Sequence, residues 1–148
     1  MIFVTVGSTK FDELIKKIDD FVSKGEIKDK VIAQIGKGEY IPKKIKYFRY
    51  KKTLKKYYKL ATIVISHEGA GTLFELVHLR KKTIAIINPN TVSNPDLINK
   101  FSKEGYIIKC ENIDNLPKII KEIERKKLKK YIAPKCFIHK KIIEFLEK

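Results

Sequence analysis

The sequence predicts an α/β fold, a Rossmann-like, doubly wound parallel sheet with helices on both faces. Three observations support this fold class. Short apolar, β-branched runs alternate with amphipathic runs along the 148 residues, glycine-rich turns follow two of the expected strands, and no internal repeat or linker interrupts the alternation. Strands that alternate with helices are typical of parallel sheets built with right-handed crossovers. We therefore expect residues 1–148 to form a single domain.

The expected elements follow from hydrophobic periodicity. Strands are predicted where apolar residues run almost without a break, at residues 1–6, 31–35, 45–48, 63–65, 83–87 and 106–108. Helices are predicted where apolar residues recur three or four positions apart, at residues 11–22, 54–61, 71–79, 95–105 and 114–123. Pro95 suits the first helical position with Asn94 as its cap. After Pro134, residues 134–148 are expected to form a terminal basic amphipathic helix.

Charge and cysteine content restrict the classes of function. The formal net charge is +16, but only three of the 33 basic residues are arginine, which disfavours a nucleic-acid-binding protein that reads bases through bidentate arginine contacts. Residues 118–148 hold eleven lysines or arginines against four glutamates, so this end is either a solvated basic face or a surface for an anionic membrane or an acidic partner. Cys110 and Cys136 have no metal-ligand spacing and indicate reduced thiols. With no expected signal peptide or membrane span, we expect a cytoplasmic protein, soluble or peripheral.

One stretch organises the predicted fold, residues 66–75 between the fourth strand and the next helix. The helix start has backbone N–H groups without intrahelical acceptors, and Gly69 and Gly71 remove the side chains that would keep a diphosphate away. Glu75 lies one turn inside the helix, where a carboxylate suits a pair of ribose hydroxyls. The alternative is a glycine-rich turn used only for close packing.

Sheet topology favours the binding interpretation. With strand order 3-2-1-4-5-6, strands one and four are neighbours at the switch point, where ligands bind at the carboxyl ends of the strands. The turn Gly7-Ser8-Thr9 and the turn Gly69-Ala70-Gly71 then face one crevice. A dinucleotide oxidoreductase is disfavoured, because the first turn lacks the Gly-x-Gly-x-x-Gly spacing and no acidic residue ends the second strand.

Several motifs together resemble a known family. They are residues 4–9, 49–51, 65–75 and 101–106. In combination they resemble the small catalytic subunit of the two-component N-acetylglucosaminyltransferase that makes lipid-linked chitobiose, and the C-terminal, donor-binding half of MurG glycosyltransferases. The resemblance implies one half of a GT-B glycosyltransferase, a single nucleotide-sugar-binding domain that takes a UDP-sugar as donor substrate without a cofactor or metal.

The resemblance also implies roles for individual residues. The backbone around Tyr50 and Lys51 would read the uracil edge, and Glu75 would bind the ribose. The diphosphate would lie against Gly69, Ala70, Gly71 and Thr72. The loop that ends at Asn94-Pro95-Asp96 would contact the sugar.

The sequence departs from the family at two places. The family often has a small residue in place of Glu68 and His-Gln in place of Pro95-Asp96, so the identity of the transferred sugar, N-acetylglucosamine or a related hexose, stays open. A Glu68 carboxylate beside a diphosphate is expected to turn outward or pair with a lysine.

Two questions stay open at this point. His67 either stabilises the departing UDP phosphate or only forms hydrogen bonds with polar groups of a buried turn. The acceptor half is expected on another polypeptide, a membrane-anchored subunit that holds a lipid-linked glycan acceptor, with the basic C-terminal segment against that partner or anionic lipid. A non-catalytic sugar-nucleotide-binding subunit of a polysaccharide glycosyltransferase is the alternative, and a nucleic-acid-binding protein is the less favoured one.

Overall fold

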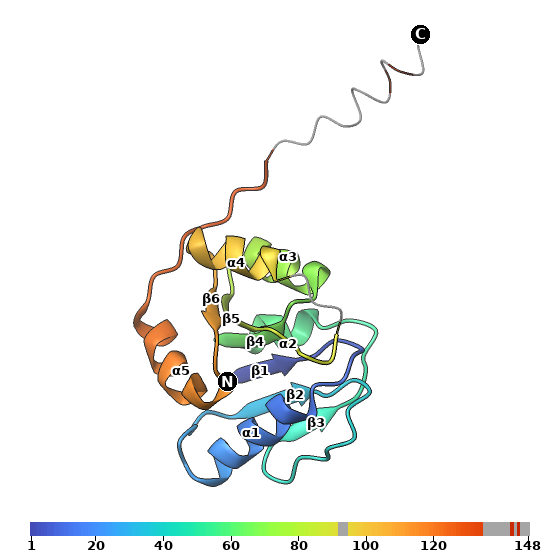
Figure 1. Cartoon of the computed structure of the whole chain (residues 1–148), viewed down its shortest axis with the longest axis vertical. Helices are drawn as coiled ribbons and strands as arrows, with labels where there is room; N and C mark the ends of the chain where they lie inside the picture. The colour runs from blue at the N-terminus through green and yellow to red at the C-terminus, as the bar shows by residue number, and fades with distance from the viewer. Residues whose placement is uncertain (92–94, 135–142, 144, 146–148) are drawn as a thin grey trace.

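The computed structural model describes residues 1–91, 95–134, 143 and 145. Within these residues, six parallel strands form one sheet in the order β3-β2-β1-β4-β5-β6, which confirms the predicted fold class and strand order (Figure 1). The strands are β1 (Ile2–Thr5), β2 (Val31–Gln34), β3 (Lys46–Phe48), β4 (Ile63–His67), β5 (Lys82–Ile86) and β6 (Ile108–Cys110).

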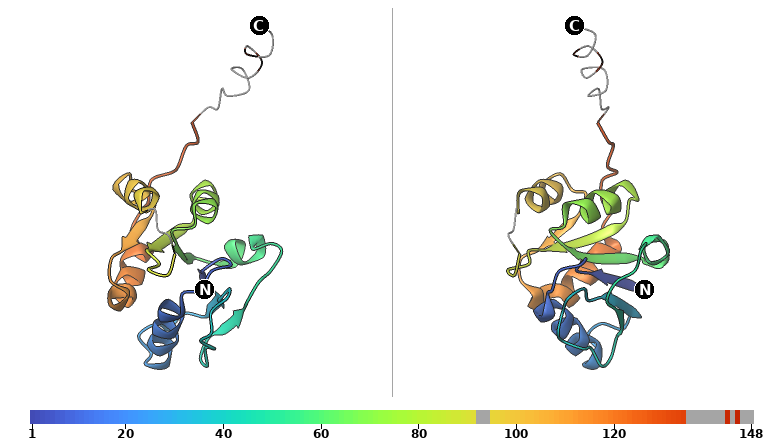
Figure 2. Two further views of the ribbon diagram at one scale, coloured as in Figure 1. Left: turned by 45° about the vertical axis from the view of Figure 1, so that its right-hand side comes forward. Right: turned by 90° about the vertical axis from the view of Figure 1, so that its right-hand side faces the viewer.

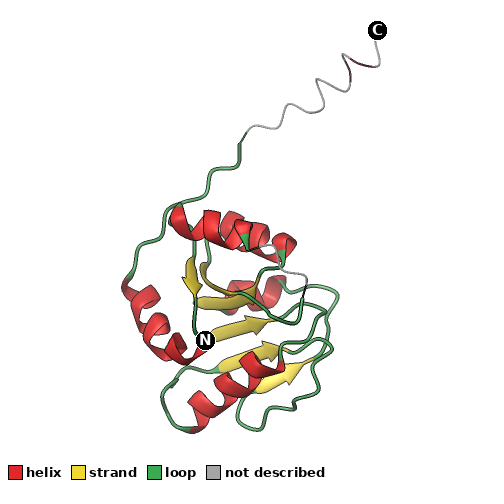
Figure 3. Ribbon diagram, viewed as in Figure 1, coloured by secondary structure: helices red, strands yellow, loops and turns green. Residues whose placement is uncertain are grey.

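Helices cover both faces of the sheet, as Figures 2 and 3 show. One face is covered by α1 (Asp12–Ser23) and α5 (Leu116–Arg125), which follows the short 3-10 turn η1 (Ile113–Asn115). The other face is covered by α2 (Lys55–Leu60), α3 (Ala70–His78) and α4 (Asp96–Lys103). No helix within the described residues is long and apolar enough to cross a membrane.

The alternation of side chains along each strand explains the two layers. On β4, Ile63 and Ile65 face the core under α1 and α5, whereas Val64 faces α2 and α3. Residues two apart lie on the same face of a strand, and here both faces are buried. The near-continuous apolar runs of the sequence reflect this double burial.

The structure corrects two strand boundaries. The last strand begins at Ile108 instead of Tyr106, because Tyr106 completes the end of α4. Its N–H bonds the carbonyl oxygen of Phe101 at 2.9 Å, and Gly105 adopts the left-handed φ of +82° that this helix termination requires. β4 extends to His67, which pairs with Ile86, so His67 belongs to the strand and not to the turn. Asn94 and nearly all of the predicted helix at 134–148 lie outside the described residues.

A buried carboxylate holds the segment between β2 and β3. Asp19 on α1 is 4% exposed and accepts hydrogen bonds from the backbone N–H groups of Lys43 (2.8 Å), Lys44 (2.7 Å) and Ile45 (3.1 Å), and from the Tyr40 hydroxyl (2.9 Å). Burial by itself would raise the pKa of Asp19, but these donors outweigh burial, so the pKa is lowered. A charged Asp19 therefore stabilises the fold.

We expect Asp19→Ala to lower the free energy of unfolding by roughly 2–4 kcal/mol, because four donors lose their acceptor. Since the folded-state pKa lies below the unfolded value of about 3.9, the Asp19 contribution is present above that pH and is lost as the pH falls through the folded pKa. Urea unfolding between pH 7 and pH 3 measures both effects, with Asp20→Ala as the control on the same helix. Equal stability of the two variants at pH 7 would contradict the assignment.

Candidate functional site

The site lies where the carboxyl ends of β1 and β4 meet. These strands are neighbours, with Thr5 opposite Ser66, and the chain leaves each of them through a glycine-containing turn. A Cβ atom placed on Gly7 would lie 3.5 Å from Nε2 of His67, and one on Gly69 would lie 3.4 Å from the same nitrogen. The His67 imidazole therefore lies between the two predicted glycine turns, which the fold brings together as expected.

The first turn of α3 presents bare backbone. Among the described residues, no side chain caps this helix at Gly69, and its first turn carries no acidic residue. A Cβ on Gly71 would meet no atom within 4 Å, so the space beside it is open. The first N–H groups of a helix lack intrahelical acceptors and carry partial positive charge, which suits a bound anion. The strand, tight turn and helix of residues 63–78 have the predicted local geometry.

The turn after β1 rests on Gly36. A Cβ on Gly36 would overlap the carbonyl oxygen of Thr9 and lie 2.8 Å from that of Gly7. The Lys37 N–H also donates to the Thr9 carbonyl at 3.0 Å, and the Thr9 hydroxyl donates to Val6 at 2.7 Å. The end of β2 thus supports the Gly7-Ser8-Thr9 turn from below and leaves Ser8 exposed.

His67 is buried and incompletely hydrogen-bonded. It is 7% exposed, and its Nδ1 atom has no hydrogen-bond partner among the described residues. That atom lies 4.0 Å from Oε2 of Glu68, too far for a hydrogen bond. Burial lowers the pKa of His67, while the Glu68 carboxylate raises it to a lesser extent. The unpartnered Nδ1 atom thus lies on the Glu68 side of the ring, whereas Nε2 is the nitrogen beside the two glycine turns.

The sequence suggested that Glu68 turns outward or pairs with a lysine. Instead its side chain is buried, and no lysine among the described residues pairs with it. Its Oε2 accepts the backbone N–H of Asn88 at 2.7 Å, and its Oε1 accepts the hydroxyl of Thr91. The Asn88 side chain in turn donates to the Lys10 carbonyl oxygen at 3.0 Å. Glu68 therefore connects the turn after β4 to the loops after β5 and β1, a function that sequence analysis missed.

Other predicted site residues lie around α2 and α4. Tyr50 is 71% exposed on the loop between β3 and α2, and the Lys51 ammonium lies 5.2 Å from the centroid of the Phe48 ring. Glu75 is exposed and lines a groove of about 370 Å³ with Lys55, Lys59, Leu79 and Lys81. Glu75 thus lies beside α2, whereas Tyr50 and Lys51 precede this helix in the loop from β3. Within the described residues, no recorded contact joins Tyr50 or Lys51 to the glycine turns.

The residues predicted to contact the sugar are only partly described. Asp96 is exposed in the first turn of α4, directly after Pro95, which has helical backbone angles of −69° and −10°. The loop from β5 leads to it, so Asp96 begins α4 on the carboxyl side of that strand. The predicted site residues at the carboxyl edge therefore come from the loops after β1, β3, β4 and β5.

Comparison with known families identifies the domain. The model of the glycosyltransferase family 28 C-terminal domain matches residues 1–146. The chain belongs to this family. The fold is similar to that of a solved structure whose sequence is only distantly similar. The crystal structure of Acinetobacter baumannii MurG superposes with a TM-score of 0.65 and 16% sequence identity, over 84% of this chain and 41% of that chain.

Two curated relatives extend the comparison of this family 28 domain. The UDP-N-acetylglucosamine transferase subunit ALG13 of Homo sapiens is 34% identical over 122 residues, which are 74% of this chain and 11% of that protein. The UDP-N-acetylglucosamine--N-acetylmuramyl-(pentapeptide) pyrophosphoryl-undecaprenol N-acetylglucosamine transferase of Clostridium perfringens is 42% identical over 77 residues, 47% of this chain and 22% of that protein. The chain thus spans a minor part of each relative.

In this family 28 domain we expect Glu68→Ala to release the loop after β5 without unfolding the sheet. The Asn88 amide loses its acceptor, so its hydrogen exchange should accelerate by about tenfold or more, whereas exchange in β4 and β5 stays slow. Glu26→Ala, an exposed acid far along the chain, is the control. Unchanged exchange at Asn88 would show that Glu68 does not hold the loop.

Proposed function

We propose that this family 28 domain binds a UDP-sugar and is the catalytic donor subunit of an inverting glycosyltransferase. The observation that carries the proposal is the bare amino end of α3, which faces the Gly7 turn across the His67 ring at the switch point of the sheet. Backbone N–H groups without side-chain competition suit a diphosphate. The names of the two curated relatives, a UDP-N-acetylglucosamine transferase subunit and an N-acetylglucosamine transferase, both begin with UDP-N-acetylglucosamine and favour that donor.

Each part of the donor has a matching group. The diphosphate would accept hydrogen bonds from the amides of Ala70, Gly71 and Thr72. Glu75 would accept both ribose hydroxyls from its place beside α2, and the exposed backbone at Tyr50 and Lys51 would meet the uracil. Asp96 and Asn94 would contact the sugar.

The proposed chemistry is a single displacement at the anomeric carbon. An acceptor hydroxyl attacks that carbon, the bond to the UDP phosphate breaks, its electron pair leaves with UDP, and a base on the acceptor half takes the hydroxyl proton. The chain's own contribution is electrostatic. The α3 amides and a proton on His67 stabilise the charge that develops on the leaving diphosphate. The sequence holds no Asp-x-Asp pair, so we propose transfer without a metal.

We further propose that the acceptor half lies on a membrane-anchored partner that holds a lipid-linked glycan. This chain corresponds to 41% of the MurG chain, which supports a complete enzyme with a second half. The human relative is named as a subunit, and the Clostridium perfringens relative carries an undecaprenol pyrophosphate in its name. The proposed location is the cytoplasmic face of a membrane, reached through the partner.

Calorimetric titration tests the donor site. UDP and UDP-N-acetylglucosamine should bind saturably, and Glu75→Ala should weaken UDP about ten- to a hundredfold, because two hydrogen bonds to a charged acceptor are lost. Glu26→Ala should leave the affinity unchanged. Binding that is equal in both variants, or salt-sensitive DNA binding in place of UDP binding, would contradict the proposal. A subunit that merely enhances another transferase would keep full activity with its partner when Glu75→Ala abolishes UDP binding.

His67 predicts a pH dependence of UDP affinity. In the free protein its pKa is lowered, whereas a bound diphosphate favours the protonated ring and raises the pKa. UDP binding should therefore take up a proton between the two pKa values, and affinity should rise as the pH falls through that window. Calorimetry in buffers of different ionisation enthalpy measures the uptake. His67→Gln should abolish it, and an uptake that persists in this variant would assign the proton to another group.

A further inference from the structure

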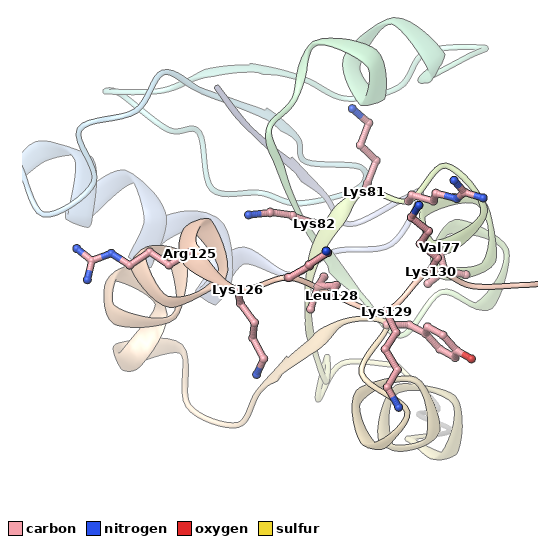
Figure 4. Close-up of a pocket in the computed structure, with 11 residues that line it drawn as sticks. Val77, Lys81, Lys82, Arg125, Lys126, Leu128, Lys129 and Lys130 are labelled. Carbon is pink, nitrogen blue, oxygen red and sulfur yellow. The ribbon is translucent and has the colours of Figure 1, made fainter.

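A strongly basic pocket lies at the opposite edge of the sheet from the donor site. It is a cavity of about 380 Å³ at the amino end of β5, bounded by the end of α3 and by residues 125–130 (Figure 4). Eight of its eleven lining residues are lysine or arginine, and none is acidic. A cavity of this size is large enough for a small ligand.

Most of these cations have no anionic partner. Within the described part of the chain, Lys126 is the one that forms an ion pair, with Glu122 at 3.4 Å. Lys81 and Lys82 donate to backbone carbonyl oxygens, of Ala61 at 3.1 Å and Glu124 at 2.6 Å. Like charges gathered around one cavity repel each other, and an anion in the cavity would relieve that repulsion.

The wall that carries Lys127 and Lys130 is anchored to the domain. Leu128 packs against the core under α1 and α5, and the Lys129 N–H donates to the Gly105 carbonyl at 2.9 Å. Tyr131 completes an aromatic cluster, with its ring centroid 5.3 Å from that of Tyr106 and 5.9 Å from that of Phe101. The basic side chains of this segment are therefore held at the cavity by its apolar ones.

Arg80 supplies an independent sign of function. Three helices, α1, α3 and α4, end in the same way, with a residue of left-handed backbone after the last turn, and these residues are Gly25, Arg80 and Gly105. Glycine adopts this conformation without strain, whereas Arg80 holds it at φ 55°. Strained residues cluster at functional sites, and Arg80 lines the basic pocket.

We propose that this pocket binds a ligand that carries two or more phosphate groups. The charged ends labelled in Figure 4 point in different directions instead of converging on one point, which fits several anionic groups better than one. Tyr106 is the one aromatic lining residue, so the pocket lacks the stacking surface that single-stranded nucleic acid uses. The ligand's phosphates are either those of a soluble polyphosphate or those of adjacent lipid headgroups.

The test uses Arg80→Gly in the full chain, a substitution that removes a charge and also suits the left-handed backbone. Inorganic tripolyphosphate is titrated at about 150 mM salt, where nonspecific attraction is screened. We expect saturable binding that weakens about tenfold in Arg80→Gly and in the double variant Lys127→Gln/Lys130→Gln. Lys16→Gln, an exposed lysine on α1, should bind as the unchanged chain does. The melting temperature of Arg80→Gly should be no lower than that of the unchanged chain.

Vesicles distinguish the two sources of phosphate. Sedimentation with vesicles of phosphatidylglycerol and phosphatidylcholine, against phosphatidylcholine alone, assigns the ligand to lipid headgroups if binding falls in the same variants. Binding of tripolyphosphate alone assigns it to a soluble ligand. The proposal is overturned if neither tripolyphosphate nor the vesicles bind, or if the variants bind them as well as Lys16→Gln does. It is also overturned if a DNA duplex alone binds and that binding weakens in Arg80→Gly. UDP titration of the same Arg80→Gly sample reports the donor site separately.

Discussion

The contact of the His67 ring with Gly7 and Gly69 joins the two halves of the sheet, where β1 pairs with β4. A Cβ atom at Gly7 or Gly69 would lie 3.5 or 3.4 Å from Nε2 of His67, in ordinary van der Waals contact, so the ring lies directly beside both glycines. Because β1 and β4 are paired, this contact also fixes the first turn of α3 relative to the turn after β1. Gly7 also has a left-handed φ of +60°, which residues with a side chain rarely adopt, so a substitution there would strain the backbone.

Polar contacts extend this arrangement to the neighbouring loops. Glu68 binds the loop after β5, Asn88 binds the loop after β1, and the end of β2 supports the Thr9 carbonyl through Lys37. Each bond joins residues far apart in sequence but near each other at the carboxyl edge. The bare amides of α3 are therefore surrounded by loops that hold one another, which is the preorganisation that electrostatic stabilisation of a leaving group requires.

Much of the fold was predictable because its determinants are local. The double burial of the strands gives continuous apolar runs, and the glycine turns mark where strands pass into helices. The start of β6 was misplaced because Tyr106 is apolar like a strand residue, yet it serves the termination of α4. The role of Glu68 was missed because its partners, Asn88 and Thr91, follow twenty or more residues later, and hydrophobic periodicity carries no signal for such pairs. The position of Arg80 was equally hidden, since lysine and arginine occur throughout this chain.

We propose that the nucleotide binds at the switch point of the sheet and not at the basic edge. Mapping backbone amide and His67 ring shifts by NMR during UDP addition tests it most directly. We expect the largest shifts at residues 7–9 and 69–72 and at the His67 ring, with residues 80, 82 and 125–130 nearly unchanged. The largest shifts at residues 80, 82 and 125–130, with the glycine turns unchanged, would contradict it.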